Sequence, residues 1–379
     1  MRVLHFAKYA FERPGGMERH VEVLTRGLAA AGVDVTVLAY DPDGTAQPRM
    51  VDGVHVEPVR PLFHLGSQAV APDMIGRARR LSRTARFDVV HEHWPDPLAH
   101  AMANFVPGRP ARVMSWHSDI VRQKWLGPMF LQLARLLPRP DAVIGATSCH
   151  LQSAQVAEFA PPQRRYVIPY GIDVAPLARA PQTLARAAAL RAAHGGGPIV
   201  FALGRHVYYK GFEVLIDAMA HVDGVLILGG EGPLTAALRA RAAHLGARVA
   251  FAGAISEAEL PAYFHACDVF CLPSVAPAEA FGIVQAEAMA CGKPVVNTWL
   301  HNGVNEVAMH DVSALTVEPG NVVALGEALR CVLADASLAR RLGEAGRDRV
   351  MRDFTVDAMV GKTFDLYMKL TARIDPSGR

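Results

Sequence analysis

Short apolar, strand-like segments alternate with amphipathic helical segments along almost the whole chain, and this alternation is the feature that most constrains the fold. Residues 17–32 have helical periodicity, end at a glycine and lie between two apolar segments. A strand, a helix and a second strand in succession make a βαβ unit, which implies a parallel sheet covered by helices. The strands expected in the first half of the chain are residues 2–7, 33–40, 53–59, 87–93, 111–117, 142–147 and 164–170.

The alternation stops once and then begins again. Residues 174–198 are rich in alanine and arginine and contain consecutive glycines, a composition typical of a connecting segment. The strands expected beyond it are residues 198–204, 224–230, 248–253, 268–273, 293–298 and 314–319. We therefore expect an α/β protein with two Rossmann-like doubly wound domains that face each other across a cleft. The expected boundaries are 1–175 and 198–355 for the domains, 176–197 for a linker, and 356–379 for a C-terminal helix that returns to the first domain.

The composition excludes several classes of protein. The net charge is only +3, which is too small to indicate nucleic-acid binding. The chain has 5 cysteines without CxxC spacing, which speaks against a disulfide framework or a zinc ribbon. No uncharged apolar run approaches the ~20 residues needed to span a bilayer, and the first residues look like a strand rather than a signal peptide. A cytoplasmic location is expected, with a peripheral position on the inner face of the cytoplasmic membrane as its variant.

The first candidate site segment is GRHVYYKG, which follows the expected strand at 198–204. It places Arg205 and Lys210 on a loop bounded by Gly204 and Gly211. Ligands of doubly wound sheets bind at the carboxyl ends of strands, and two fixed cations beside a helix start suit a diphosphate. An ordinary exposed loop is the alternative interpretation.

A second candidate segment, EAFGIVQAE, follows the expected strand at 268–273. Its glutamates, Glu279 and Glu287, flank the start of a helix, where the N–H groups of residues 281–283 lack intrahelical partners. The carboxylates could bind the hydroxyl groups of a sugar and a ribose, whereas the alternative is a helix cap plus a surface glutamate. The weaker segment GGEGP adds Gly230 and Glu231 to the same edge.

The first half of the chain offers glycines and histidines at strand ends. Gly15 and Gly16 let the backbone approach a ligand closely before a helix, and His117 ends a strand with Asp119 nearby. In HEHWPDPLAH, His91 and His93 lie on one strand face, and a pocket role is preferred to a metal site because no firm ligand spacing completes a metal set. The DPD at 41–43 resembles a metal-binding motif, but its proline and the following glycine indicate a turn.

With these motifs in place, the chain resembles glycosyltransferase family 4 over about residues 1 to 370. The motifs that carry the resemblance, in chain order, are PGGMERHV, SWHSDIVRQK, VIPYGID, GRHVYYKGFEVLIDAM, GGEGPL, EAFGIVQAEAMACGKPVV and LTVEPGN. The resemblance implies a retaining, nucleotide-sugar-dependent transferase of the GT-B fold. The versions WHSDIVRQK and HEHWPDPLA resemble the branch that builds bacterial surface polysaccharides such as the O-antigen of lipopolysaccharide, often by mannosyl transfer. One departure is Ser313-Ala314, which stands where relatives usually carry a glycine before leucine.

The resemblance also implies roles by position. Arg205 and Lys210 match the pair on the donor diphosphate, Glu279 the glutamate on the donor sugar, and Glu287 the one on the ribose. His117 matches the histidine that touches the transferred sugar, so the expected catalytic set is His117, Arg205, Lys210 and Glu279. Further donor contacts are expected at Gly15, Gly16, Gly204, Gly230, Glu231, Ala280, Phe281, Gly282 and Ile283. Acceptor contacts are expected at His91, His93, Trp94, His117 and Asp119.

The expected reaction moves a sugar, with mannose from GDP-mannose as the first choice, to a glycan or a lipid-linked oligosaccharide. No metal or cofactor is expected, because the two cations and the helix start can stabilise the charge on the leaving diphosphate. No carboxylate nucleophile has a secure position, so the route to retention stays open. A sugar-nucleotide epimerase of the same build and a non-catalytic two-lobed sugar-binding protein remain alternatives.

Two basic segments of the first domain suggest a membrane surface as a further partner. Residues 75–88 carry a series of arginines, and residues 121–140 mix arginine and lysine with tryptophan, phenylalanine and leucine. Cations beside an apolar face are what an interfacial helix needs. The alternative is that the apolar stripe packs on the sheet and the arginines are ordinary surface cations.

Overall fold

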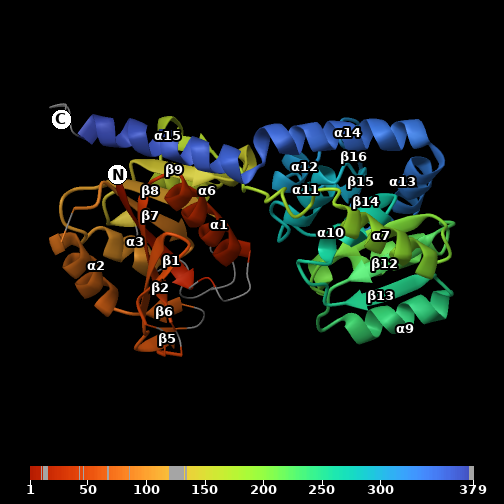
Figure 1. Cartoon of the computed structure of the whole chain (residues 1–379), viewed down its shortest axis with the longest axis horizontal. Coiled ribbons are helices and arrows are strands. Elements are labelled where there is room, and N and C mark those ends of the chain that lie inside the picture. Colours follow the sequence, from red (N-terminus) through yellow and green to blue (C-terminus); the bar gives the residue numbers. More distant parts are fainter. Residues whose placement is uncertain are drawn as a thin grey trace. The chain divides into compact units, whose positions relative to one another are not determined.

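The computed structural model describes residues 1–9, 11, 16–41, 43–45, 47–65, 68–84, 86–118, 132 and 135–374. The chain divides into a first unit, Met1–Gly171 with Val356–Arg379, and a second unit, Ile172–Thr355 (Figure 1). Each unit is built on its own largely parallel sheet with helices on its faces. The predicted α/β class with two Rossmann-like domains is therefore confirmed.

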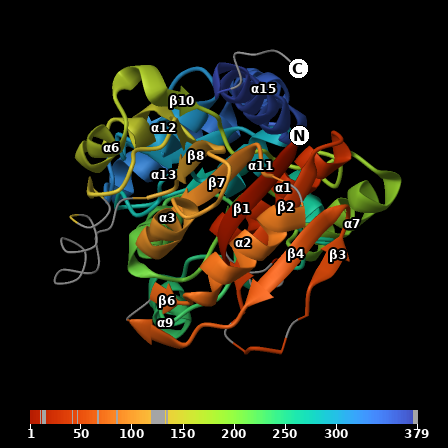
Figure 2. The same ribbon diagram turned by 90° about the vertical axis from the view of Figure 1, so that its left-hand side faces the viewer.

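The first unit contains an eight-stranded sheet in the order β10-β9-β8-β7-β1-β2-β4-β3, in which only the β3–β4 pair is antiparallel. Figure 2 shows β8, β7, β1, β2 and β4 side by side in this order. A separate antiparallel hairpin consists of β5 (Phe63–Leu65) and β6 (Gln68–Val70). The sheet strands are β1 (Arg2–Tyr9), β2 (Asp34–Tyr40), β3 (Arg49–Val51), β4 (Val54–Val59), β7 (Val89–Trp94), β8 (Ala111–Trp116), β9 (Ala142–Gly145) and β10 (Arg165–Val167).

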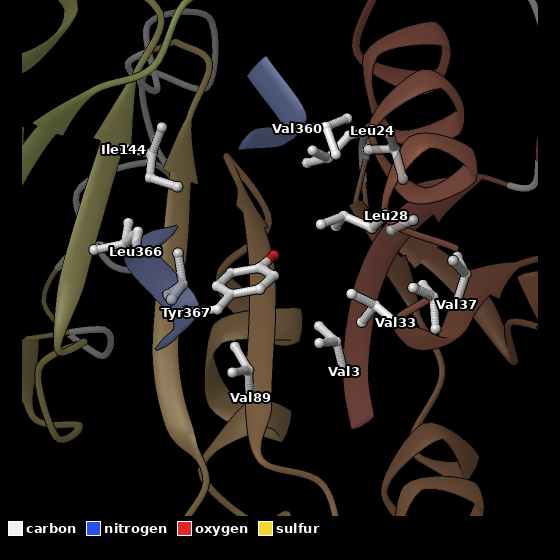
Figure 3. Packing of buried hydrophobic residues seen from close by; sticks show 14 of the residues in the cluster. Val3, Leu24, Leu28, Val33, Val37, Val89, Ile144, Val360, Leu366 and Tyr367 are labelled. Atoms are coloured by element: carbon white, nitrogen blue, oxygen red, sulfur yellow. The ribbon is translucent and has the colours of Figure 1, made fainter. Parts of the chain in front are cut away.

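Side chains alternate between the two faces of this sheet, as strand geometry requires. Val3 lies on the face covered by α1 (Gly16–Ala30) and α15 (Val356–Ile374), whereas Leu4 lies on the face covered by α2 (Asp73–Thr84) and α3 (Pro97–Ala103). Figure 3 shows Val360 of α15 beside Leu24 of α1, and Tyr367 beside Val89 of β7. The last helix of the chain thus completes the core of the first unit. Its shorter helices are α5 (Ser148–Leu151), α6 (Ala154–Phe159) and the 3₁₀ turn η1 (Pro162–Arg164).

The second unit contains a six-stranded, fully parallel sheet in the order β13-β12-β11-β14-β15-β16. Its strands are β11 (Ile199–Leu203), β12 (Val225–Gly229), β13 (Val249–Gly253), β14 (Val269–Leu272), β15 (Val295–Thr298) and β16 (Ala314–Val317). The helices are α8 (Phe212–Met219), α9 (Thr235–Leu245), α10 (Leu260–Ala266), α11 (Ile283–Ala290), α12 (Gly303–Val307), α13 (Val322–Ala334) and α14 (Ala336–Asp353), with the 3₁₀ turn η2 at Tyr208–Lys210. Successive strands run outward from β11 in one direction and from β14 in the other, so the order reverses between these two strands.

The segment 176–197, expected as a linker, belongs to the second unit. It contains α7 (Pro181–Ala193), whose Ala187 and Leu190 pack against Ala262 and Ala266 of α10. The alanine-rich segment whose composition suggests a connector forms a helix with a small apolar face, and that face is buried. The boundary between the units accordingly lies at Gly171 rather than at residue 175.

Candidate active site

The loops that carry the expected donor residues lie where the strand order of the second sheet reverses. The loop after β11 holds Arg205 and Lys210, and the loop after β14 holds Glu279. In open α/β sheets this reversal opens a crevice at the carboxyl ends of the two strands, and ligands bind there. The two loops therefore become neighbours, although Lys210 and Glu279 are 69 residues apart in sequence.

An ion pair joins the two loops directly. Lys210 Nζ donates to Glu279 Oε2 at 2.5 Å, and the two side chains are only 11% and 12% exposed. Ser274 Oγ donates to the same carboxylate oxygen at 3.3 Å. Arg205 lies on the same loop as Lys210 but is exposed to solvent. The site thus combines one accessible cation with one cation held against a carboxylate.

Glycines allow the loops at this edge to approach one another. Gly230 has a φ of +98°, and a Cβ atom there would lie 2.1 Å from the carbonyl oxygen of Gly204. Only glycine fits that position, and Gly230 N donates to Gly253 O at 2.7 Å. Glu231, the next residue, is exposed. The expected donor residues Gly204, Gly230 and Glu231 therefore lie together at the ends of β11 and β12.

The start of α11 is suited to an anion. Gly282 is the N-cap with a φ of +71° and carries no side chain that could cap the helix, so the first N–H groups of α11 receive no capping oxygen from it. The helix dipole adds partial positive charge there. Ala280 and Ile283 are half-buried, and Phe281 packs edge-on against Phe354. Glu287 lies within α11 and is half-buried.

The first unit collects histidines on one face of its sheet. His5 of β1 pairs in register with His91 of β7, and His93 pairs with Ser115 of β8. Their side chains share the face that α1 and α15 cover, because they have the same alternation as Val3 and Val89. His117 follows β8 on the same face, and His20 of α1 lies against it. The predicted common face of His91 and His93 is confirmed.

A chain of hydrogen bonds, here called the histidine ladder, consists of His5, His93, His117 and Tyr170. His5 Nδ1 lies 3.2 Å from His93 Nε2, His93 Nδ1 lies 3.0 Å from His117 Nε2, and His117 Nδ1 lies 2.8 Å from Tyr170 Oη. Each inner imidazole must donate through one nitrogen and accept through the other, so the tautomers along the ladder are coupled. Beside the ladder, His91 bonds to Tyr367 Oη at 2.5 Å and to Ser115 Oγ at 2.7 Å.

The same histidines form two groups whose ring nitrogens lie close together. Nitrogen atoms of His5, His91 and His93, and of His20, His93 and His117, do lie within 4.8 Å of one another. The His91 and His93 rings are stacked at 17°, and the His93 and His117 rings at 16°. Both nitrogens of His91, His93 and His117 lie within hydrogen-bond distance of a neighbouring group.

Burial keeps these imidazoles neutral. It lowers the pKa of His5 to about 3 and that of His20 to about 4. It also holds the pKa values of His91, His93 and His117 well below the usual value. A neutral, hydrogen-bonded histidine group inside the core is a structural element as well as a candidate part of the site.

This burial predicts acid sensitivity of the fold. The unfolded chain protonates its histidines near pH 6.5. In the folded chain, His5 and His20 are protonated only near pH 3 and 4, and the pKa values of the other three buried histidines are likewise lowered, so stability falls as the pH drops below about 6.5. Each such histidine contributes a slope of up to about 1.4 kcal/mol per pH unit. Thermal unfolding followed by circular dichroism between pH 7.5 and 4 should show this fall. His91→Gln, which can still bond Tyr367 and Ser115, should flatten it, whereas His221→Gln at an exposed position should not; an equal effect of both would contradict the assignment.

Several expected acceptor residues lie deeper than the sequence suggests. His91 and Trp94 are 0% and 1% exposed, and Trp94 stacks on Trp116, so neither offers a free surface to an acceptor. His117 is 8% exposed, at the carboxyl end of β8. Gly16 is the exposed first residue of α1. Gly15, Asp119 and Pro42 of the DPD motif lie outside the described residues.

Comparisons with known proteins agree with this architecture. Residues 190–349 match the model for glycosyl transferases group 1, and residues 14–176 match that for glycosyltransferase family 4. The O-antigen chain mannosyltransferase C of Escherichia coli is 27% identical over 98% of this chain and 99% of its own length. The D-rhamnosyltransferase WbpZ of Pseudomonas aeruginosa is 31% identical over 94% and 92%. Sucrose-phosphate synthase from Thermosynechococcus elongatus has the same fold, with a TM-score of 0.80 at 24% identity over 98% of this chain and 100% of that one.

The two Rossmann-like units have the GT-B fold of these structural neighbours. The chain belongs to glycosyltransferase family 4, and its second unit contains the segment that matches the group 1 model. Its membership favours a hexosyltransferase over the epimerase and the sugar-binding protein that the sequence left as alternatives. Among the described residues, no helix is long and apolar enough to cross a membrane.

Proposed function

We propose that the protein is a retaining glycosyltransferase that moves mannose from GDP-mannose to a glycan or lipid-linked oligosaccharide in bacterial surface polysaccharide synthesis, such as that of an O-antigen. The observation that carries the proposal is the Lys210–Glu279 ion pair at the reversal of the second sheet, beside Arg205 and the start of α11. This arrangement combines cations for a diphosphate with a carboxylate for sugar hydroxyls.

In this proposal the second unit binds the donor. Arg205 and Lys210 bind the diphosphate, and the N–H groups of residues 281–283 complete its anion site. The Lys210 ammonium has three donors, so it can keep Glu279 oriented while it binds a phosphate oxygen. Glu279 accepts hydrogen bonds from the transferred sugar and Glu287 from the ribose.

The first unit binds the acceptor, with His117 at the carboxyl end of β8 as its contact to the reacting sugar. His93 and Tyr170 hold the His117 ring through both of its nitrogens. His91, His93 and Trp94 then shape the pocket from behind rather than touch the acceptor, because they are buried.

The choice of mannose and GDP rests on the relatives. The Escherichia coli relative is an O-antigen chain mannosyltransferase, and a Mycobacterium leprae relative, 31% identical, is a phosphatidyl-myo-inositol mannosyltransferase. The Pseudomonas aeruginosa relative is a D-rhamnosyltransferase, and Anabaena HepE, a structural neighbour, was solved with UDP and with UDP-glucose. The sugar and the base are therefore the first points to test.

A nucleotide panel followed by product analysis tests the proposal. GDP and GDP-mannose should raise the melting temperature more than UDP and UDP-glucose, since ligands that bind only the folded state stabilise it. Transfer from GDP-α-mannose to a lipid-linked acceptor should give an α-linked product by NMR. A β-linked product would contradict retention, and stabilisation by UDP alone would contradict the donor base.

The same assay tests whether a metal is required. Activity should persist in excess EDTA, because Arg205, Lys210 and the start of α11 supply the charge that a divalent ion supplies elsewhere. Loss of activity in EDTA with recovery on added manganese or magnesium would contradict this expectation. EDTA should leave the melting temperature of the GDP-bound protein unchanged.

We further propose that an anionic membrane surface binds the first unit through α2. Arg77 and Arg80 of this helix are paired with Glu57 at 2.8 and 2.7 Å, and Arg80 remains 61% exposed. Arg79, Arg83 and Arg86 are also exposed. Most of the second expected segment, 121–140, lies outside the described residues. Each exposed arginine adds about 1 kcal/mol near an anionic leaflet, and salt weakens the attraction.

Sedimentation with liposomes measures this association. The protein should bind phosphatidylglycerol-containing vesicles at low salt and be released at high salt. The double variant Arg79→Glu/Arg83→Glu should bind less, whereas Arg340→Glu/Arg341→Glu on the exposed face of α14 should bind like the wild type. Absence of binding to anionic vesicles at low salt would contradict the membrane proposal and leave the transferase activity unaffected.

A further inference from the structure

Asn302 connects the loop after β15 to the main chain at Glu279. Its Nδ2 donates to the carbonyl oxygen of Glu279 at 2.7 Å. Its Oδ1 accepts from Val304 N at 3.0 Å and so caps α12. One contact needs a donor and the other an acceptor, so the two partners fix the orientation of the amide.

A second amide keeps Asn302 in place. Asn305 Oδ1 accepts from the N–H groups of Leu300 and His301, each at 2.9 Å, and its Nδ2 donates to Thr298 O at 2.9 Å. His301 has a φ of +51°, a conformation that a residue with a side chain adopts at a cost. The hydrogen bonds of Asn305 hold the backbone of His301 in this conformation, immediately before Asn302 in the chain.

These contacts belong to a closed network of hydrogen bonds that includes Glu279. Ser274 Oγ donates to the Glu279 carboxylate, and Thr298 Oγ1 donates to Ser274 O at 2.5 Å. Thr298 O accepts from Asn305, Asn305 N donates to Asn302 O at 3.1 Å, and Asn302 donates back to Glu279 O. Ser274 and Thr298 are 0% and 2% exposed. Hydrogen bonds therefore hold Glu279 at both ends. Lys210 and Ser274 bind its carboxylate, and Asn302 binds its main-chain carbonyl group.

We infer that Asn302 is a positioning residue for the transfer reaction: it fixes the peptide plane at Glu279 and thereby aims the carboxylate at the sugar being transferred. The inference rests on the proposed function of Glu279. Asn302 needs no contact with the donor for this role. Removal of its donor N–H should disturb the transition state more than nucleotide binding, because the diphosphate is bound by other groups.

Asn302→Ser separates this role from helix capping. Serine can still cap α12, but its hydroxyl is too short to reach Glu279 O while it does so. The matched control is Asn321→Ser, because Asn321 caps α13 by accepting from Ala324 N at 3.0 Å and makes no contact with Glu279. We expect Asn302→Ser to lower kcat with GDP-mannose by up to ~10²-fold, the loss that a displacement of about 1 Å produces.

Three readouts decide the inference. The dissociation constant of GDP and the melting temperature should match those of Asn321→Ser, and kcat should fall only in Asn302→Ser. An equal kcat in the two variants would overturn the positioning role. A parallel loss of GDP affinity, or of melting temperature beyond that of the control, would overturn it in favour of general loop support. If Glu279→Ala retains wild-type activity, the proposed function of Glu279 fails instead, and the two failures are thus distinguishable.

Discussion

Alanine in place of Lys210 should lower turnover by ~10²- to 10³-fold, because the leaving diphosphate loses one charge-stabilising contact. Arg205→Ala should have an effect of similar size for the same reason. Both are measured as kcat with saturating GDP-mannose. A wild-type rate in either folded variant would contradict the assignment of the diphosphate site.

The structure separates these two variants by their effect on stability. The sequence suggests that both cations lie on a surface loop, but only Arg205 is exposed, whereas Lys210 is buried against Glu279. Lys210→Ala leaves a mostly buried carboxylate without its counter-charge, which is destabilising. The melting temperature should fall in Lys210→Ala and stay unchanged in Arg205→Ala.

The double variant Lys210→Ala/Glu279→Ala is the control for this interpretation. It removes the unpaired carboxylate, so the melting temperature should recover toward the wild-type value while the activity stays low. If the double variant were less stable than both single variants, the ion pair would not explain the loss.

Alanine in place of Glu279 should lower kcat by ~10²-fold or more and change KM for the donor little, because its contact strengthens as charge develops on the transferred sugar. Glu287→Ala should instead weaken GDP binding by about tenfold, or ~1.4 kcal/mol, through loss of the ribose contact. Steady-state kinetics and calorimetric titration with GDP measure the two effects.

The two glutamate variants are controls for each other. Glu279→Ala should leave the affinity for GDP near the wild-type value, and Glu287→Ala should leave kcat near it. Glu231→Ala, at the exposed end of β12, should have a smaller effect on both. Unchanged GDP affinity in Glu287→Ala would contradict the ribose role. An effect of Glu279→Ala on KM alone would indicate uniform binding of the sugar instead of stabilisation of the transition state.

The sequence predicted the two sheets because each strand is a short apolar run between helices with their own stop residues. It also predicted that Arg205, Lys210 and Glu279 would lie at carboxyl ends of strands, and the structure adds that they flank the reversal point. Strand order decides this, and no local pattern in one sequence reveals which strands become neighbours.

The residues that support the candidate site could not be predicted from the sequence for a related reason. Ser274, Asn302 and Asn305 act through hydrogen bonds to main-chain atoms of other loops, and such contacts leave no spacing rule. His5 and His20 join the histidines of β7 only through the register of β1 and the packing of α1. The signs of that group in the sequence were the two-residue spacing of His91 and His93 and the place of His117 at the end of a strand. The linker prediction was wrong for the same kind of reason, because the partner of α7 lies on α10, far along the chain.

The packing of α15 has a consequence for biosynthesis. Met359, Val360, Leu366, Tyr367 and Leu370 are core residues of the first unit, although they are made after the whole second unit. The second unit is continuous in sequence, so a growing chain can complete its core as soon as residue 355 has left the ribosome. The first unit must wait, with α1 covering only part of one face of its sheet, until α15 emerges. The order of folding during translation is therefore the reverse of the order of synthesis, and the nascent first unit is the part that needs protection from aggregation.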